Sequence, residues 1–434
     1  MSGDIIFAIG LIIGLLFLLL IGLEIAWSVG VIALVGLVFF VNQPIDQIAY
    51  TMWDSLNSFA LTAMPLFILM GSILGNTGVN EKLFSAINKW TGHLPGGLVI
   101  SVISGNAVFA AMSGSAMAAT ATFGKIAYPA MAKRGYAPSF ALGSIAAGSV
   151  LAPLIPPSIL LILYGAWQGI SIVDLLAAGL VPGIMLTVLL ILTAMIMVKI
   201  NPKLAPPPVK YTWAERGKAL IESLPFVVVI FGVLGAIFGG LMTPTEAGGL
   251  GALLSILLTL YYRRLTFKIL QQSLLETVRV TSFSLFIMAM ATLISHVFNS
   301  AGIIPMLKDY VLAMELGKYT ILFGFFVMYL VMGMFFDSWS MLFLTFPFVM
   351  PIITGVGINP IWWGVIYVMA AEQRTITPPF GLVLFVMKSV VPEHSMSTVV
   401  KGALPYLIPI YINILLLIIF PELVLWLPRL LSGD

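Results

Sequence analysis

The chain has 434 residues, of which 60% are hydrophobic and only 9% are charged, and its formal net charge is +3. Because a soluble globular domain carries about 25% charged residues, this composition excludes a protein whose whole surface faces water. The 20 Lys and Arg form no basic tract, so no nucleic-acid partner is expected, and the absence of Cys excludes disulfides and thiolate chemistry. We expect an integral membrane protein with the lipid bilayer as its surroundings.

Ten apolar stretches, most of them roughly 17–25 residues long, follow one another, and this is the length that a helix needs to cross the hydrocarbon core of a bilayer. Barrel strands are about 10 residues long and alternate in polarity, so helices are favoured. No basic residue precedes the first stretch and no cleavage site follows it, so we expect it to be retained. The expected spans are 5–21, 25–41, 59–76, 138–165, 174–198, 224–241, 248–262, 281–298, 361–387 and 403–427.

A different kind of apolar region, at about 97–128, is not expected to cross the membrane. Its arms, Leu98–Met112 and Ala116–Tyr128, have about 15 residues each, or roughly 22 Å of helix. The polar, glycine-containing residues Ser113-Gly114-Ser115 lie between them. This pattern favours a re-entrant helical hairpin; packing of small residues between ordinary spans is the alternative.

The next apolar stretch, 138–165, is interrupted by Pro153, Pro156 and Pro157. Proline lacks an amide hydrogen and clashes with the preceding turn, so the stretch is expected to form a broken helix. Lipid cannot satisfy the freed carbonyls. A cation held by carbonyls and by the flanking Ser149 and Ser158 is one solution, and buried water or Ser and Thr side chains are the other.

The second half repeats this organisation after a Pro-rich, basic linker at 201–222, which is expected to be cytoplasmic. A second hairpin is expected at about 319–350, with Asp337-Ser338-Trp339-Ser340 as its tip. The stretch 361–387 is interrupted at Pro378-Pro379, beside Thr375 and Thr377. The Ser and Thr hydroxyls around both breaks are hard oxygen donors, which suit Na⁺ and not transition metals.

Two charged residues, Glu372 and Arg374, precede the second break at membrane depth, where isolated charges cost several kcal/mol. Either they pair with each other, or Arg374 faces a carboxylate substrate, for which a guanidinium is well suited. Helix N-termini at the breaks and hairpin tips would add partial positive charge. The pattern favours an anionic substrate accompanied by cations.

An internal repeat appears when the chain is shifted by 222 residues. Glu24 then aligns with Glu246, Pro129 with Pro351, Gly135 with Gly357, Pro138 with Pro360, and Pro156-Pro157 with Pro378-Pro379. We therefore expect an all-α polytopic protein of two repeats, 1–200 and 223–434, each with five transmembrane helices, one hairpin and one broken helix. Because five is odd, the second repeat enters the membrane inverted, an arrangement typical of transporters.

Orientation follows from the distribution of basic residues. With the N-terminus outside, 16 of the 20 Lys and Arg fall on the inside, three fall outside, and Arg374 lies at membrane depth. The positive-inside rule therefore predicts that both termini are periplasmic.

Three motifs together resemble the large membrane subunit of TRAP transporters over nearly the whole chain. They are Ser113-Gly114-Ser115, Thr243-Pro244-Thr245-Glu246-Ala247 and Thr377-Pro378-Pro379-Phe380-Gly381. The resemblance implies a Na⁺-driven importer of an organic acid in a bacterial inner membrane, working by an elevator movement. It also implies two partners, a periplasmic substrate-binding protein and a small four-helix membrane subunit, expected here as a separate chain.

The resemblance also implies site residues, carried over by position. Those for the substrate are Ser113, Ser115, Pro156, Ser338, Ser340 and Pro378, to which Arg374 is added because of its charge at membrane depth. Those for Na⁺ are Ser113, Gly114, Ser149, Pro153, Asp337, Ser338, Thr375 and Thr377, and two or more ions are expected. The family usually has a small residue, often Gly, where this chain has Arg374. This departure leaves the substrate geometry there open, and the sequence does not identify the acid.

Three other functions are conceivable for an integral membrane protein of this composition. An intramembrane enzyme is not expected, because the chain has only three His and neither a Gly-x-Ser-x-Gly nor a His-Glu-x-x-His motif. A channel would conduct even with one hairpin immobilised, whereas a carrier would stop. A Na⁺/dicarboxylate symporter that needs no binding protein is the main alternative, because it would share the architecture.

Overall fold

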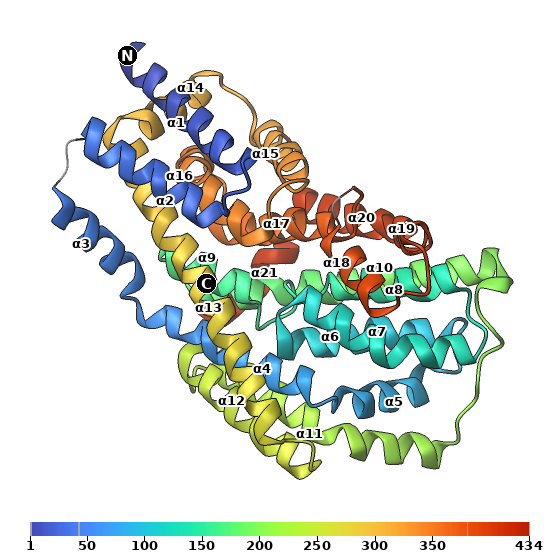
Figure 1. Ribbon diagram of the computed structural model, residues 1–434. Coiled ribbons are helices and arrows are strands. Elements are labelled where there is room, and N and C mark those ends of the chain that lie inside the picture. Colours follow the sequence, from blue (N-terminus) through green and yellow to red (C-terminus); the bar gives the residue numbers. More distant parts are fainter. Residues whose placement is uncertain (1, 42–43, 380, 434) are drawn as a thin grey trace.

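The computed structural model describes residues 2–41, 44–379 and 381–433, which form helices and turns with no strand among them (Figure 1). The helices of the first half are α1 Ser2–Leu20, α2 Ile25–Gly36, α3 Ile45–Leu56, α4 Ala63–Asn76, α5 Asn80–Thr91, α6 Gly97–Ser113, α7 Ala116–Lys133, α8 Pro138–Ser149, α9 Ile159–Gln168 and α10 Ile172–Ile200. A π-helical turn, Leu37–Val41, extends α2, and a 3₁₀ turn, Phe59–Thr62, precedes α4.

The second half has eleven α-helices within the same described ranges. They are α11 Trp213–Phe238, α12 Pro244–Tyr261, α13 Phe267–Ser300, α14 Ile303–Ala313, α15 Lys318–Met332, α16 Ser338–Gly355, α17 Pro360–Gln373, α18 Leu382–Val390, α19 Met396–Ala403, α20 Leu407–Ile419 and α21 Glu422–Ser432. Short 3₁₀ turns occur at Pro202–Leu204, Arg374–Ile376 and Leu404–Tyr406. The all-helical class expected from the sequence is therefore correct.

Six helical segments of the described chain are long and apolar enough to cross a membrane. They are Phe59–Asn76, Ile172–Ile200, Trp213–Phe238, Phe267–Ser300, Ser338–Gly355 and Met396–Ile419. Shorter apolar helices overlap three of the other expected spans, at Ile9–Leu20, Ile25–Phe39 and Ile159–Gln168. The last one, expected at 403–427, differs: its helix ends at Ile419, and α21 begins after Phe420-Pro421 because proline supplies no amide to continue the ladder.

The first hairpin consists of α6 and α7, which pack side by side and are joined by Gly114 and Ser115 (Figure 1). Gly114 has a positive φ of 58°, a conformation that glycine adopts without steric cost. In the second hairpin region, residues 333–337 join α15 to α16. Both second arms continue five residues past their expected ends, to Lys133 and Gly355, since Pro129 and Pro351 are accommodated inside the helices.

The two proline interruptions have the same local organisation. Before each broken helix lies a glycine with positive φ, Gly135 at 80° and Gly357 at 74°, and a proline opens α8 and α17 at the first turn. The helix then stops, at Ser149 and at Gln373, and resumes as α9 and α18. The peptide bonds Pro156-Pro157 and Pro378-Pro379 are both cis.

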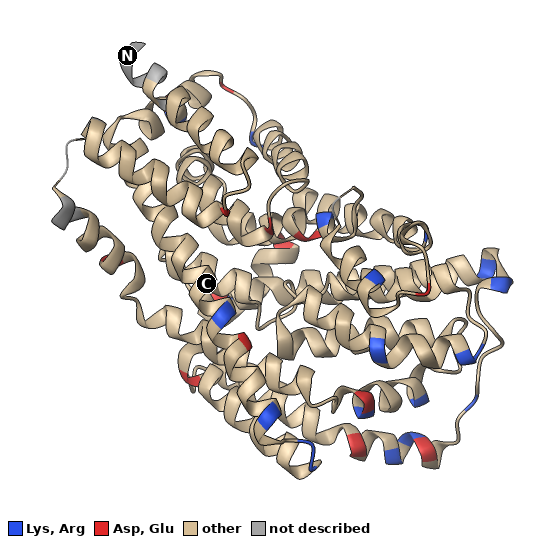
Figure 2. Ribbon diagram, in the orientation of Figure 1, with Lys and Arg blue, Asp and Glu red and all other residues tan. Residues whose placement is uncertain are grey.

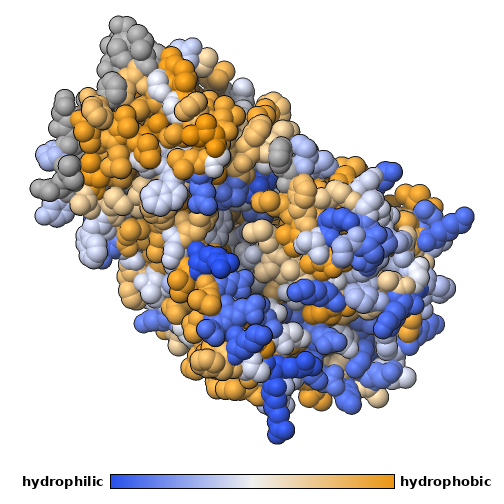
Figure 3. Space-filling view, viewed as in Figure 1, coloured by the Kyte–Doolittle hydropathy of each residue, from blue (hydrophilic) through white to orange (hydrophobic). Residues whose placement is uncertain are grey.

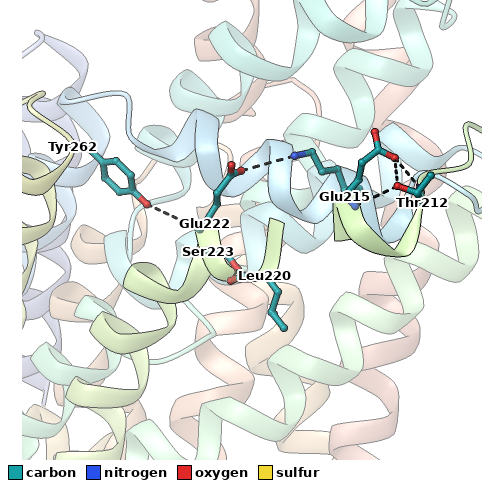
Figure 4. Close-up of polar contacts among 7 residues, drawn as sticks. Thr212, Glu215, Leu220, Glu222, Ser223 and Tyr262 are labelled. Atoms are coloured by element: carbon teal, nitrogen blue, oxygen red, sulfur yellow. Dashed lines mark hydrogen bonds and ion pairs between the residues drawn. The ribbon is translucent and has the colours of Figure 1, made fainter. Parts of the chain in front are cut away.

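The linker between the halves is held to the protein near α5 and α11. Helix α11 begins at Trp213, inside the segment assigned to the linker, because Thr212 and Glu215 form a capping box. Figure 4 shows this box beside the contacts of Glu222, whose carboxylate lies 3.8 Å from Lys89 Nζ and whose carbonyl accepts a 2.9 Å hydrogen bond from Tyr262.

Charge and hydrophobicity are unevenly distributed over the molecule. Most Lys and Arg lie toward the lower and right margins in Figure 2, where the linker and the ends of α5, α7 and α11 meet. The surface at the upper left, formed by α1 and α2, is mainly hydrophobic in Figure 3. This distribution is typical of a membrane protein, which presents apolar surface to lipid and concentrates its basic residues on one side of the bilayer.

Candidate functional site

A cavity of about 660 Å³ lies where both hairpin tips meet both broken helices. Helix α4 and helix α13 complete its wall. Its polar and charged lining residues are Ser72, Asn76, Ser113, Ser115, Thr122, Lys125, Glu276, Arg279, Asp337, Ser338, Trp339, Glu372, Arg374 and Thr375. Segments more than 250 residues apart in sequence therefore face one volume, which is large enough for a small organic molecule.

The tip of the first hairpin fits closely against its surroundings. A Cβ added to Gly114 would lie 3.0 Å from Ile159 and 3.2 Å from the carbonyl of Pro157, so this glycine touches the first break. A Cβ on Gly71 of α4 would lie only 2.7 Å from the Ser113 Cα. Small residues thus permit the backbone contacts that position the tip.

Two hydroxyls at this tip behave differently. Ser115 caps α7 by accepting a 3.3 Å hydrogen bond from the amide of Ala118. The Ser113 hydroxyl is buried, lines the cavity and has no hydrogen-bond partner in the described protein. Buried polar groups are almost always hydrogen-bonded, so Ser113 Oγ is free to bond with a molecule that enters the cavity.

At the second tip, one hydroxyl links two buried charges. Ser338 Oγ donates a 2.7 Å hydrogen bond to Glu372 Oε1 and accepts a 3.0 Å bond from Arg374 Nη2. Glu372 and Arg374 are therefore linked by hydrogen bonds through Ser338 and do not form a direct ion pair. Tyr367 adds a hydrogen bond from its hydroxyl to the Ser338 carbonyl. The tip and the second break are thereby joined as one polar unit.

Asp337 has a structural part in this tip. Its Oδ1 accepts hydrogen bonds from the amides of Trp339 at 3.0 Å and Ser340 at 3.1 Å, which makes it the N-cap of α16. Its Oδ2 accepts the Ser340 hydroxyl. The acidic tip residue thus satisfies the orphan amides of a helix start while its side chain faces the cavity.

The carbonyls freed at the breaks are partly satisfied by nearby hydroxyls. Ser158 donates to the Pro153 carbonyl and also caps α9. In the second break, Thr375 donates to the Glu372 carbonyl at 2.6 Å and Thr377 to the Gln373 carbonyl at 2.8 Å. At these carbonyls, Ser and Thr side chains therefore supply the hydrogen bonds, which is one of the solutions expected from the sequence.

The residues predicted from the sequence fall into two sets. Those that line the cavity are Ser113, Gly114, Ser115, Pro153, Asp337, Ser338, Arg374 and Thr375. Those that do not are Ser149, Pro156, Ser340, Thr377 and Pro378. Ser149 lies buried in α8 with its hydroxyl on the Ala146 carbonyl. Phe380, part of the third motif, lies outside the described residues.

Sequence reasoning missed the part of the lining that comes from α4 and α13. Asn76 donates hydrogen bonds of 3.1 Å each to Ser273 and Glu276, and Arg279 lies one turn further along α13. Helix α13 begins at Phe267, well before the expected span at 281, so Ser273, Glu276 and Arg279 lie on a part of the helix that the sequence did not predict. Their signal was a polar set at helical spacing, Glu276 and Arg279 with Ser273.

The lining carries groups that can bind ions. The second tip provides carboxylate and hydroxyl oxygens, and the first provides a buried hydroxyl without a partner, all of which are ligands for hard cations. Arg374 supplies the guanidinium that a carboxylate or phosphate favours. The described residues include no group of three or more His, Asp or Glu arranged to hold a metal ion.

Comparison with known proteins gives consistent results. The family model described as "Tripartite ATP-independent periplasmic transporter, DctM component" matches residues 12–423. The sialic acid TRAP transporter large permease protein SiaM of Vibrio cholerae is 31% identical over 428 residues, covering 98% of this chain and 99% of that protein. The C4-dicarboxylate permease DctM of the same species is 32% identical over 97% and 98% of the two chains, respectively. The 2,3-diketo-L-gulonate permease YiaN of Escherichia coli is 30% identical over 93% and 95%.

Solved structures of transporters share the fold at much lower sequence identity. The YdaH transporter of Alcanivorax borkumensis superposes with a TM-score of 0.61 at 15% identity, covering 88% of this chain and 89% of that one. The antimetabolite efflux pump MtrF of Neisseria gonorrhoeae gives a TM-score of 0.58 at 13% identity, with coverage of 87% and 84%.

Proposed function

The chain belongs to the DctM family, the large membrane subunits of tripartite ATP-independent periplasmic transporters, and from that premise we propose that it couples uptake of an organic acid anion to Na⁺ entry. Membership makes it a multi-pass transport protein that takes up a solute by secondary transport together with a binding protein. The proposal adds the driving ion, the class of substrate, the bacterial inner membrane with both termini periplasmic, and a small four-helix membrane subunit as the second partner.

The observation that carries the proposal is the shared cavity between both tips and both breaks. Arg374 would orient the carboxylate of the substrate, with Ser338 and Ser115 as hydroxyl partners. Ser113, Asp337 and Thr375 would supply oxygens to Na⁺, since each lines the cavity and Ser113 Oγ has no protein partner. Ser149, Pro156, Ser340, Thr377 and Pro378 would act behind this layer, by shaping the two breaks.

An alternating-access mechanism is supported by the symmetry of the parts. Each half contains a hairpin region and a broken helix introduced by a positive-φ glycine and a proline. Two inverted repeats can exchange conformations and so open one site to either side. In the elevator form of this mechanism, α6–α9 and α15–α18 move together, and the remaining helices, including α13, form the scaffold.

The energetics favour more than one sodium ion. One charge crossing 100 mV is worth about 2.3 kcal/mol, and a tenfold Na⁺ gradient adds about 1.4 kcal/mol. Two ions provide roughly 7 kcal/mol, of which a monoanion moving inward consumes about 2.3. The remaining ~5 kcal/mol supports more than a thousandfold accumulation, whereas one ion would leave under about 2 kcal/mol.

The test is uptake into proteoliposomes that contain this chain and its small subunit. A thermal-shift screen of the cognate binding protein against organic acids first identifies the labelled substrate. Uptake should then require an inward Na⁺ gradient and rise with a Hill slope above one. Uptake that does not depend on Na⁺, or a Hill slope of one, would overturn the proposed coupling of substrate uptake to Na⁺ entry.

The same assay separates the main alternative. Omitting the binding protein should abolish uptake through a tripartite system. A symporter that works alone would instead show full uptake without it, whatever its dependence on sodium.

A further inference from the structure

The cavity continues well beyond the hairpin tips, along a path formed by three helices. Each helix contributes residues spaced by three or four positions, which is one helical face. The faces are Ile68, Gly71, Ser72, Gly75 and Asn76 on α4, Ala118, Ala121, Thr122 and Lys125 on α7, and Glu276, Arg279, Val280 and Phe283 on α13.

Close contacts fix the direction of this path. Gly71 lies against Ser113 at the tip, Gly75 lies opposite Thr122 one turn further, and Asn76 bonds Glu276. From Ala116 to Lys125, α7 descends about 14 Å at 1.5 Å per residue. The path therefore leads from the tips to a far end bounded by Asn76, Lys125, Glu276 and Arg279.

The far end lies on the basic side of the protein. Helix α7 continues from Lys125 to Lys133 and is followed by Arg134, and Lys268 lies in the first turn of α13. By the positive-inside rule this side is cytoplasmic. The described conformation is thus one in which the cavity leads toward the cytoplasm.

The charges at the far end are unbalanced. Glu276 is engaged by Asn76, whereas Lys125 and Arg279 form no hydrogen bond or ion pair with another described residue. Both cations line the cavity and both are exposed. Two uncommitted cations against one engaged carboxylate give this opening a net positive potential, which draws anions.

We propose that Lys125 and Arg279 form an anion-receiving station through which the carboxylate of the substrate passes from the hairpin site to the cytoplasm. This rests on the proposed function, because it concerns the exit of the same organic acid. Arg374 holds the carboxylate deep in the cavity, and the pair of cations, with Lys125 about 14 Å from the first hairpin tip along α7, lowers the barrier to leaving it.

The two cations also belong to different parts of the proposed elevator. Lys125 lies on the first hairpin, which would move, and Arg279 lies on α13 of the scaffold. They flank one opening in this conformation, and movement of the hairpin would separate them. The station would therefore exist when the site faces the cytoplasm and be taken apart when it faces the periplasm.

The chain contains no cysteine, so Thr122→Cys introduces a single thiol into the path. Inside-out vesicles carrying this variant, coexpressed with the small subunit, are treated with a sulfonate-bearing or a trimethylammonium-bearing methanethiosulfonate. The rate with the sulfonate reagent is divided by the rate with the trimethylammonium reagent, and this ratio is normalised to the same ratio for a free thiol. The normalised ratio measures the local preference for anions. Lys125→Gln with Arg279→Gln should lower this ratio roughly tenfold.

Two controls make the result specific. Lys133→Gln removes a charge from the same helix outside the cavity lining and should change the ratio by less than about twofold. The charge-conserving pair Lys125→Arg and Arg279→Lys should retain it, which guards against misfolding of the neutral variant. An unchanged ratio in the neutral double variant, or an equal fall with Lys133→Gln, overturns the station.

Failure of this test is distinguishable from failure of the proposed function. The thiol reaction needs neither a sodium gradient nor the substrate, so it reports on the path alone. Uptake without Na⁺ dependence would overturn the coupling while leaving the ratio of rates as it is.

Discussion

Arg374 donates a 3.0 Å hydrogen bond to the hydroxyl of Ser338, and Ser338 passes a 2.7 Å bond to Glu372. The arginine and the glutamate are only 7% and 6% exposed. A single hydroxyl thus joins the second hairpin tip to the second break and separates two buried charges that would otherwise have to meet.

Replacing Arg374 by Gln should abolish uptake and destabilise the protein. Removing one partner of a buried charged pair typically costs about 3–5 kcal/mol, because the other charge is left uncompensated. The double variant Glu372→Gln/Arg374→Gln should recover much of the melting temperature in detergent but none of the uptake. Arg264→Gln, an exposed arginine, serves as the control for both measurements.

Two outcomes would contradict this account of Arg374. Near-normal uptake by the single variant would remove it from the substrate site. Uptake restored by the double variant would mean that Arg374 only balances the charge of Glu372.

Replacing Ser338 by Ala should raise the Na⁺ concentration that uptake requires and lower the stability of the protein. The change leaves Arg374 Nη2 and Glu372 Oε1 without their common partner, and hydrogen bonds to charged groups contribute about 1.5–3 kcal/mol. The Na⁺ concentration for half-maximal uptake should rise roughly tenfold or more. Ser223→Ala, which removes a hydroxyl bonded within its own helix, should shift neither quantity; equal shifts would assign Ser338 no special place.

The interruptions of the apolar stretches could be predicted because they depend on local chemistry. Proline has no amide hydrogen to donate, so Pro153 predicts a break in its helix from the sequence alone. The polar triplet at 113–115, with Gly114 at its centre, likewise predicts the turn between the two hairpin arms. The ends of the hairpin arms could not, because a proline such as Pro129 is tolerated once neighbouring helices enclose it. Local rules fail where tertiary packing supplies the missing partner.

The cavity could be predicted only in part for a related reason. Sequence placed residues near Ser113 and Arg374 on one site, since charge and hydroxyls at membrane depth need a function. It could not place Asn76 or Arg279 there, because α13 begins well before the expected span at 281 and converges with α4 only in three dimensions. Hydropathy measures where a helix is apolar and not where it stops.

Two substitutions of Asp337 should distinguish its role as the N-cap of α16 from a role in binding Na⁺. Asn caps helices about as well as Asp, whereas Ala loses about 1 kcal/mol. If Asp337 also binds Na⁺, Asp337→Asn keeps the melting temperature of the wild type but raises the Na⁺ requirement, and Asp337→Ala alters both. A normal Na⁺ requirement in Asp337→Asn would restrict this residue to capping α16.

Gly71→Ala should impair uptake through the shape of the first tip alone. In an ordinary helix position, replacing Gly by Ala stabilises by up to about 1 kcal/mol. At Gly71 the new methyl would lie 2.7 Å from the Ser113 Cα, so the tip backbone must shift, whereas at Gly75, one turn along the same face, its nearest neighbours lie 3.9 and 4.0 Å away. Gly75→Ala should therefore raise the melting temperature and Gly71→Ala lower it, together with the uptake rate. Equal melting temperatures and equal uptake in the two variants would show that the contact between α4 and the hairpin does not position Ser113, and the cavity would then need another explanation for its shape.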